Sequence, residues 1–358
     1  MKKLDWYILK KFLGTFVFIM ALLMSITIVI DLSEKIDAFV DNHAGVWVII
    51  SGYYIYFIPY ITSLIGPFFV LVACIFFTSQ LAARSEIVAI LNSGTSFYRM
   101  LWPYFVGATI LAGAFYYGNH YFVPYSNKKR IAFERVYVSK PIQGLRFQIH
   151  RTIAPGTNIY IENYKPADGT GYKFSIDRFA NGRLVYKLRS DKIEWDSVKR
   201  IWHVSNYYIR QLDTAGDKIS SGAMIDSTFG FQPSDIKFTE IYKDVMTTPE
   251  LIAYIDEAKQ SGQSDMEFFE VERFRRTSSS FSIYIMTLIG VSLASRKVRG
   301  GLGWHLMLGI GLSALYEIIM KFTTTFSTNA NLPAFLGVWI PNVLYLGLAI
   351  YLIRKAPK

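Results

Sequence analysis

Hydrophobic and polar positions divide this chain into long apolar segments near both ends and an alternating stretch between them. A helix needs about 20 mostly apolar residues to cross a hydrocarbon core about 30 Å thick. Six segments approach or exceed that length, the fourth once it is extended back through 277–280. They are residues 12–30, 52–80, 101–123, 281–295, 304–322 and 335–353. The pattern predicts a polytopic membrane protein with six transmembrane helices, the second of them bent at Pro59 or Pro67.

Between the third and fourth apolar segments the hydrophobic period changes to two. Phe174 and Ile176 fall on one face of a predicted strand, and Tyr186 and Leu188 fall on one face of the next. Asn181-Gly182 between them is a strong hairpin signal. Short strands separated by turns predict an inserted all-β domain, a sandwich, jelly roll or partial barrel.

These patterns predict three parts of the chain. Residues 1–123 carry three spans, and residues 276–358 carry three more. Residues 124–275 form the β-rich domain, which includes a short helix near 248–260 with Pro249 in its first turn. The predicted fold is therefore a six-helix membrane protein with a jelly-roll-like domain inserted after the third span.

Charge gives the predicted helices an orientation. The chain has a net charge of +11, which by itself would allow a nucleic-acid partner. The short segments 1–11, 81–100, 296–303 and 354–358 contain twelve of the 38 basic residues but only two of the 27 acidic ones. Basic residues concentrate in cytoplasmic loops of membrane proteins. We therefore expect both termini in the cytoplasm and the β domain outside, and no nucleic-acid partner.

Composition and motifs limit the chemistry. Hydrophobic residues make up 52% of the chain and charged residues 18%, which argues against a wholly soluble enzyme. The sequence contains no Gly-Lys pair, so a nucleotide-binding P-loop is excluded. Cys74 is the one cysteine, and the five histidines are scattered. We expect no metal, no cofactor and no catalytic residues.

One loop between spans has the pattern of a short amphipathic helix. It runs over about 84–94, with Ser85 as its expected N-cap, Glu86 in its first turn and Gly94 as its end. Its candidate contact residues are Arg84, Ser85, Glu86, Ile87, Ile90, Leu91 and Gly94. Such a helix could dock a soluble motor protein, or it could only anchor the loop at the membrane surface.

Charged and aromatic side chains supply two further candidate sites. The charged candidates near the expected outer membrane edge are Lys35, Lys128, Lys129, Arg130, Glu317 and Lys321. The basic triplet 128–130 is either a contact for lipid phosphates or solvated charge near a domain hinge. Glu317 falls inside an apolar segment and is either functional or paired with Lys321. Phe174, Ile176, Tyr186, Leu188, Trp195 and Trp202 form either a sandwich core or an apolar path for acyl chains.

Three local sequences add a family resemblance. They are the segment 84–96, in which a Ser-Glu pair precedes small and apolar residues and a Gly, the segment 193–206, and the cluster Glu272, Arg273, Arg275 and Arg276. Together with three spans on each side of a β-rich domain, they resemble the lipopolysaccharide-export ABC-transporter permeases of the LptF/LptG type. The resemblance covers essentially the whole chain.

That resemblance implies a transport subunit in the bacterial inner membrane, with no catalytic activity of its own. Such a permease pairs with a second related six-span permease, binds a dimer of a separate cytoplasmic ABC ATPase through the helix at 84–94, and joins a periplasmic jelly-roll bridge protein. It extracts lipopolysaccharide from the inner membrane and passes it to that bridge. Two alternatives remain open: a permease that moves its outer domain without transporting lipid, and a membrane-bound lipid-modifying enzyme.

Overall fold

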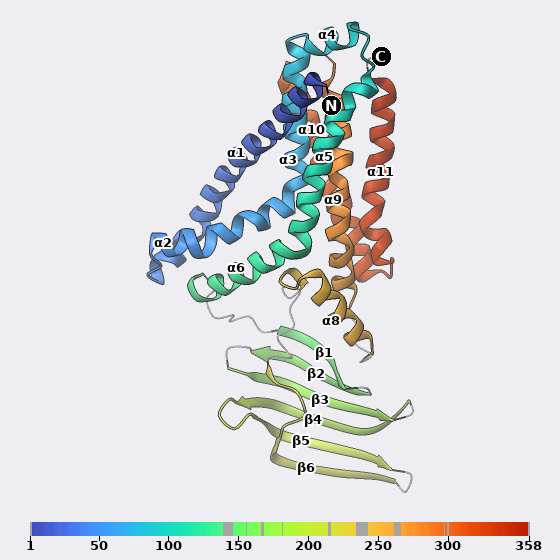
Figure 1. Ribbon diagram of the computed structural model, residues 1–358. Helices are drawn as coiled ribbons and strands as arrows, with labels where there is room; N and C mark the ends of the chain where they lie inside the picture. The colour runs from blue at the N-terminus through green and yellow to red at the C-terminus, as the bar shows by residue number, and fades with distance from the viewer. Residues whose placement is uncertain are drawn as a thin grey trace. The chain divides into compact units, whose positions relative to one another are not determined.

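The computed structural model describes residues 2–138, 146–154, 156–165, 168–180, 182–213, 216–233, 243–260, 266–296, 298 and 301–356 (Figure 1). The chain forms two compact units. The helical unit comprises 1–137, 243–251 and 267–358, and the strand unit comprises 138–242 and 252–266. The helical unit includes residues 124–137 and the start of the helix at 267, which the sequence analysis placed in the β-rich domain.

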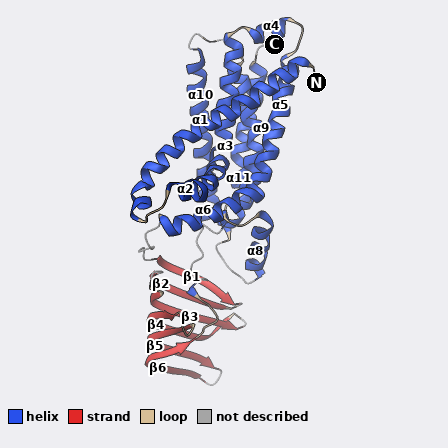
Figure 2. Ribbon diagram, turned by 60° about the vertical axis from the view of Figure 1, so that its left-hand side comes forward, coloured by secondary structure: helices blue, strands red, loops and turns tan. Residues whose placement is uncertain are grey.

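The helical unit is built from long helices (Figure 2). In the described residues two π-helical turns lie between them. Its elements are α1 (Lys3–Asp41), α2 (Val46–Ile49), η1 (Ile50–Tyr54), α3 (Ile55–Ala83), α4 (Glu86–Asn92), α5 (Phe97–Tyr117), η2 (Gly118–Phe122), α6 (Val123–Tyr137), the first turn of α8 (Thr248–Gln260), α9 (Glu267–Ala294), α10 (Gly301–Asn329) and α11 (Ala334–Lys355). The two chain ends and α4 lie at one end of this unit, which we call the α4 end, and α6 lies at the opposite, α6 end (Figure 1).

Five helical segments in the described part of the chain are long and apolar enough to cross a membrane: α1, α2 to α3, α9, α10 and α11. This confirms a polytopic helical protein. The expected span at 101–123 corresponds to α5 and η2, which are not among the five, because the Tyr, Trp, Pro and Gly residues of this stretch lower its hydropathy. The expected bend in the second span is found at Ile65, whose φ of −116° and ψ of 16° interrupt α3 two residues before Pro67.

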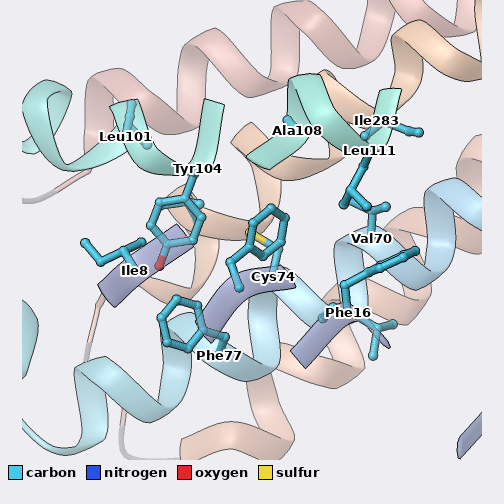
Figure 3. Close-up of a cluster of buried hydrophobic side chains, with 14 of the residues drawn as sticks. Ile8, Phe16, Val70, Cys74, Phe77, Leu101, Tyr104, Ala108, Leu111 and Ile283 are labelled. Atoms are coloured by element: carbon cyan, nitrogen blue, oxygen red, sulfur yellow. The ribbon is translucent and has the colours of Figure 1, made fainter. Parts of the chain in front are cut away.

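Large apolar side chains from α1, α3, α5 and α9 fill the core of the helical unit (Figure 3). Phe12 of α1 packs on Tyr104 of α5, with ring centroids 5.6 Å apart. The two helices approach closely at Gly107, where a Cβ atom would lie 2.7 Å from the ring of Phe12. Cys74 is fully buried in this core, where it packs as a small apolar residue.

The described residues of the strand unit form one six-stranded antiparallel sheet in the order β1-β2-β3-β4-β5-β6. Its strands are β1 (Arg146–Ala154), β2 (Thr157–Lys165), β3 (Thr170–Ala180), β4 (Arg183–Asp196), β5 (Ile201–Asp213) and β6 (Gly216–Ser227). The predicted hairpin at 181–182 joins β3 to β4, and Gly182 supplies its positive φ of 76°. Each described strand pairs with the next one along the chain. A jelly roll has two sheets joined by crossover connections, and the described strands do not confirm that part of the expectation.

One face of the sheet carries the core of the strand unit. Phe174, Ile176, Leu188 and Trp202 are each no more than 1% exposed. Phe231, from the segment after β6, covers this face, and its carbonyl accepts a hydrogen bond from Trp202 Nε1 at 2.9 Å. The period of two in the sequence therefore identified the buried face of the described strands.

Candidate functional site

The predicted amphipathic helix is present as α4 between α3 and α5. Its C-terminal end has the expected geometry, whereas its N-terminal end does not. Gly94 has a φ of 83°, and its N–H donates to the carbonyl of Leu91 at 3.0 Å, as expected of a helix stop. The expectation for Ser85 is wrong in its chemistry. Ser85 occupies the N-cap position, but its φ of 59° is left-handed and its hydroxyl makes no capping hydrogen bond.

The apolar face of α4 points into the helical unit. Ile87 is 1% exposed, and Ile90 and Leu91 pack against the same core from partly buried positions. The opposite face is exposed and carries mostly small or polar residues: Arg84, Ser85, Val88, Ala89 and Asn92. Ile87, Ile90 and Leu91 thus anchor α4 on the helical unit, and the opposite face of the helix remains accessible.

Two side-chain contacts connect α4 and its neighbours to the start of α1. Glu86 Oε2 accepts a hydrogen bond from the Tyr7 hydroxyl at 3.2 Å. Arg99 at the start of α5 pairs with Asp5 at 2.6 Å, and Asp5 also accepts from the backbone N–H of Lys2 at 2.7 Å. Sequence reasoning missed both contacts because the partners are far apart in the chain. The α4 end is therefore held by three helices rather than by a free loop.

At the α6 end, two of the candidate lipid-binding cations are paired within the chain. Lys35 Nζ lies 2.8 Å from Asp31 and 3.0 Å from Glu134, and it also contacts the hydroxyl of Tyr53. Arg130 shares Glu134 at 2.8 Å. This network connects α1, η1 and α6. Both cations are largely neutralised by carboxylates.

The remaining charged candidates are more accessible. Lys128 and Lys129 of α6 are exposed, and so is Lys321 of α10. Glu317 is half-buried one helical turn before Lys321. Among the described residues no ion pair within 4.0 Å joins Glu317 to Lys321. The expected alternative, in which these two residues pair with each other, is therefore not found.

A second polar cluster surrounds the start of α9, where the sequence showed only a run of charges. Glu272 is 5% exposed and accepts from Arg275 Nε at 2.7 Å and from Arg276 Nε at 3.1 Å. A small cavity of about 20 Å³ lies beside these side chains. That volume holds about one water molecule and excludes a lipid chain. The wall is completed by residues of α3, η2 and α6, including Tyr60, Ser63, Asn119 and Asn127.

The six aromatic and aliphatic candidates of the strand unit all belong to its apolar face. Tyr186 and Trp195 are partly buried there, beside the four fully buried residues. Phe229 and Phe231 stack against this face from the segment after β6. In the described residues this face is therefore a packed hydrophobic core, with Phe229 and Phe231 covering part of it.

The comparisons with known proteins agree with this architecture. A search among curated proteins finds no match. One family model, described as lipopolysaccharide export system permease LptF/LptG, matches residues 6–355, nearly the whole chain. The match spans the helices on both sides of the strand unit, and with them α4 and the α9 cluster. The resemblance noted in the sequence is confirmed, and the chain belongs to the LptF/LptG family of lipopolysaccharide export permeases, the non-catalytic membrane subunits of an ABC transporter.

Proposed function

We propose that this chain is one of two paired six-span permeases that extract lipopolysaccharide from the bacterial inner membrane. A dimer of a separate cytoplasmic ABC ATPase drives the extraction, and a periplasmic bridge protein receives the lipid. The observation that carries the proposal is the placement of α4, a short helix anchored on the helical unit with one face exposed. Since the sequence has no P-loop, ATP must act through a partner, and α4 offers that partner a surface.

The exposed face of α4 is the proposed docking surface. Arg84, Ser85, Val88 and Asn92 would contact the ATPase, with Glu86 at the edge of the contact. Ile87, Ile90 and Leu91 would transmit the force, because they pack into the helices that must move. Gly94 would let the chain turn sharply from α4 into α5.

We propose α5 as the sixth span, which places both termini in the cytoplasm and the strand unit in the periplasm. The basic surplus of the segments next to the chain ends and α4 supports this orientation. The proposal also puts the α6 end, with its charged residues, at the outer edge of the membrane, where the phosphates of lipopolysaccharide lie.

Lys128, Lys129 and Lys321 are the proposed first contacts for those phosphates, because their ammonium groups are exposed. Lys35 and Arg130 would bind a lipid phosphate only if that phosphate replaced Glu134 as their ion-pair partner. The half-buried carboxylate of Glu317 would lower the net positive charge around Lys321. The apolar face with Trp195 and Trp202 would take acyl chains once Phe229 and Phe231 move aside.

The test is purification of the tagged chain from its native host in mild detergent, with mass spectrometry of bound proteins and lipids. We expect a second permease, an ABC ATPase and a lipid A-containing glycolipid in one complex. Lys128→Gln/Lys129→Gln should reduce the glycolipid but not the proteins, whereas Lys173→Gln, which removes a charge from the strand unit, should change neither. Recovery of the ATPase without glycolipid from the unaltered chain would contradict lipid extraction.

A further inference from the structure

The segment that runs from α2 through α3 contains far more apolar sequence than one membrane crossing needs. It is a candidate span of 38 residues, Val46–Ala83, and no Asp, Glu, Lys or Arg occurs between residues 42 and 83. At 1.5 Å per residue this segment is about 57 Å long, whereas a hydrocarbon core is about 30 Å thick. A straight helix of that length would have to tilt by about 58°, beyond the usual range of about 0 to 40°. About half of the segment is therefore surplus to the crossing.

The bend at Ile65 divides this segment into two parts of similar length. The part after the bend contains most of the buried residues of α3 and packs against α1, α5 and α9. It is about 27 Å long, which is close to one crossing. The part before the bend consists of α2, η1 and the beginning of α3, and we call it the 46–64 arm. The arm is the surplus that needs another explanation.

The 46–64 arm carries large apolar side chains that the described residues leave uncovered. Val46, Trp47 and Ile55 are 70%, 80% and 56% exposed, respectively. None of the four residues of α2 is buried. A contiguous exposed apolar surface is unfavourable in water and marks contact with an apolar partner. The arm therefore needs such a partner.

The direction of the 46–64 arm is fixed, because the arm packs on α6. The ring of Phe133 of α6 lies 5.7 Å from that of Tyr53 in the arm and 6.2 Å from that of Phe39 of α1. At Gly52 an added Cβ atom would lie only 2.8 Å from Phe133. Figure 1 and Figure 2 both show α2 beside α6. The exposed side chains of the arm thus belong to a packed surface and not to a loose loop.

The end of α1, which leads into the arm, is amphipathic. Val29, Ile36 and Val40 are exposed and share one face of α1, which continues from its apolar segment toward α2. The exposed acidic residues 34, 37 and 41 follow another face of the same helix. A helix of this kind lies in the membrane interface, with its apolar face toward the lipid and its charged face toward water. The apolar surface of the arm is therefore continuous with a lipid-facing surface of α1.

The exposed face of α6 has the composition of a membrane interface as well. Tyr121, Phe122 and Tyr125 are exposed at its beginning, and Lys128 and Lys129 are exposed one turn later. Aromatic side chains and lysines gather where the hydrocarbon core of a bilayer meets its headgroups. The surroundings of the arm thus favour a lipid surface over a protein as its partner.

We propose that the 46–64 arm lies in the membrane interface at the α6 end, with Trp47 inserted at the boundary between lipid headgroups and acyl chains. Its partner is the phospholipid surface itself. The bend at Ile65 turns the arm into the plane of the membrane instead of letting it continue outward, and the arm fixes the depth of the α6 end. This anchoring needs neither lipopolysaccharide nor an ATPase, so it goes beyond the proposed function.

The test measures depth with spin labels on the full chain, reconstituted in vesicles of phosphatidylethanolamine and phosphatidylglycerol without lipopolysaccharide. The reporter is Val46→Cys, and the buried native Cys74 should stay unlabelled. Phe18→Cys, at a 58% exposed position in the apolar segment of α1, is the hydrocarbon reference. Val198→Cys, at a 90% exposed position between β4 and β5, is the aqueous reference. Power saturation compares the access of dissolved oxygen, which enriches in lipid, with that of a water-soluble nickel chelate.

We expect the Val46 label to be more accessible to oxygen than to the chelate, at a depth within about 10 Å of the boundary between headgroups and acyl chains. An arm that continued straight outward from Ile65 would place this label about 28 Å farther out, where it would match Val198→Cys. Adding Trp47→Ser should shift the Val46 label toward the aqueous reference. The melting temperature in detergent should not change, because Trp47 is 80% exposed.

Trp102→Ser is the matched control, since Trp102 of α5 is also exposed, at 51%, and lies outside the arm. It should leave the depth of the Val46 label unchanged. A label that matches the aqueous reference would overturn the proposal by placing the arm in water. An immobilised label that neither oxygen nor the chelate reaches would also overturn it, by showing that protein covers the arm. An equal depth with and without Trp47→Ser would refute the anchoring role of Trp47.

Discussion

The side chains of Ile87 and Val88 are neighbours in sequence but point to opposite sides of α4. Ile87 is 1% exposed and Val88 is 54% exposed. Ile87→Ala should lower the stability of the detergent-solubilised protein by about 2–5 kcal/mol, as core truncations do. Val88→Ala should leave the melting temperature unchanged and weaken co-purification of the ATPase. A loss of stability in Val88→Ala, together with weaker co-purification of the ATPase in a stable Ile87→Ala, would contradict the proposed docking face.

Asp244, which lies just before α8, gives the stability of the helical unit a pH dependence. Burial, and next the negative charge of Glu272, raises the pKa of Asp244 to about 6. The folded state therefore holds this proton more tightly than the unfolded chain. The resulting stabilisation is complete below the usual aspartate pKa of 3.8 and is lost as the pH rises through about 6.

Asp244→Asn cannot ionise and should escape that loss. We expect it to melt a few degrees above the unaltered protein at pH 7.5 and close to it at about pH 4, near the usual aspartate pKa, measured by thermal denaturation in detergent. The exposed Asp256→Asn on α8 is the matched control and should show no such pH-dependent gain. An equal shift of Asp244→Asn at both pH values would show that ionisation of Asp244 is not the cause.

At the scale of elements, close helix packing depends on a few glycines. A Cβ atom at Gly66 of α3 would overlap the ring of Phe115 of α5, whereas one at Gly113 of α5 would meet nothing within 4 Å. Gly66→Ala should therefore destabilise the helical unit by about 1–3 kcal/mol, as overpacking does. Gly113→Ala should not destabilise it. Adding Phe115→Leu to Gly66→Ala should restore the melting temperature, because the smaller side chain leaves room for the new Cβ atom. A double variant that melts as low as Gly66→Ala would argue against the α3–α5 contact.

Local sequence signals predicted most elements but not the charged network of the α6 end. The apolar segments, the bend near Pro67 and the hairpin at Gly182 follow from interactions between residues close in the chain. The pairing of Lys35 with Glu134 joins residues 99 positions apart, so no local pattern contains it. α1 also continues to Asp41, beyond the apolar segment that ends at residue 30, and in this extension Lys35 pairs locally with Asp31 and over a long sequence distance with Glu134.

The order of the strands and the role of Ser85 were unpredictable for different reasons. Alternation fixes which face of a strand is buried, but it does not say whether successive strands form one sheet or two. Ser85 has the right residue type for an N-cap, yet the tight connection from α3 forces its backbone into the left-handed region. In the same way, the Glu272–Arg276 cluster was visible as charge, while its contacts to Thr248 and Lys243 required the fold.

At the scale of the whole molecule, the number of spans decides where every candidate site lies. α5 has 21 residues and a length of about 30 Å, enough to cross the hydrocarbon core. α6 carries Lys128, Lys129, Arg130 and Glu134, so it is too charged to cross. If α5 spans the membrane, α4 and the strand unit lie on opposite sides. If it does not, they lie on the same side, and α4 could not meet a cytoplasmic ATPase while the strand unit meets a periplasmic bridge.

Two single cysteines distinguish these topologies. Val198 is 90% exposed in the turn between β4 and β5, and Ser93 is exposed at the end of α4. In intact spheroplasts a membrane-impermeant maleimide should label Val198→Cys but not Ser93→Cys, and detergent permeabilisation should make both reactive. The unaltered chain is the control, since its buried Cys74 should stay unlabelled. Equal labelling of both positions before permeabilisation would show that α5 does not cross the membrane, because no other described helix between these positions could make the crossing. In that case α4 and its proposed cytoplasmic ATPase would lie on opposite sides of the membrane.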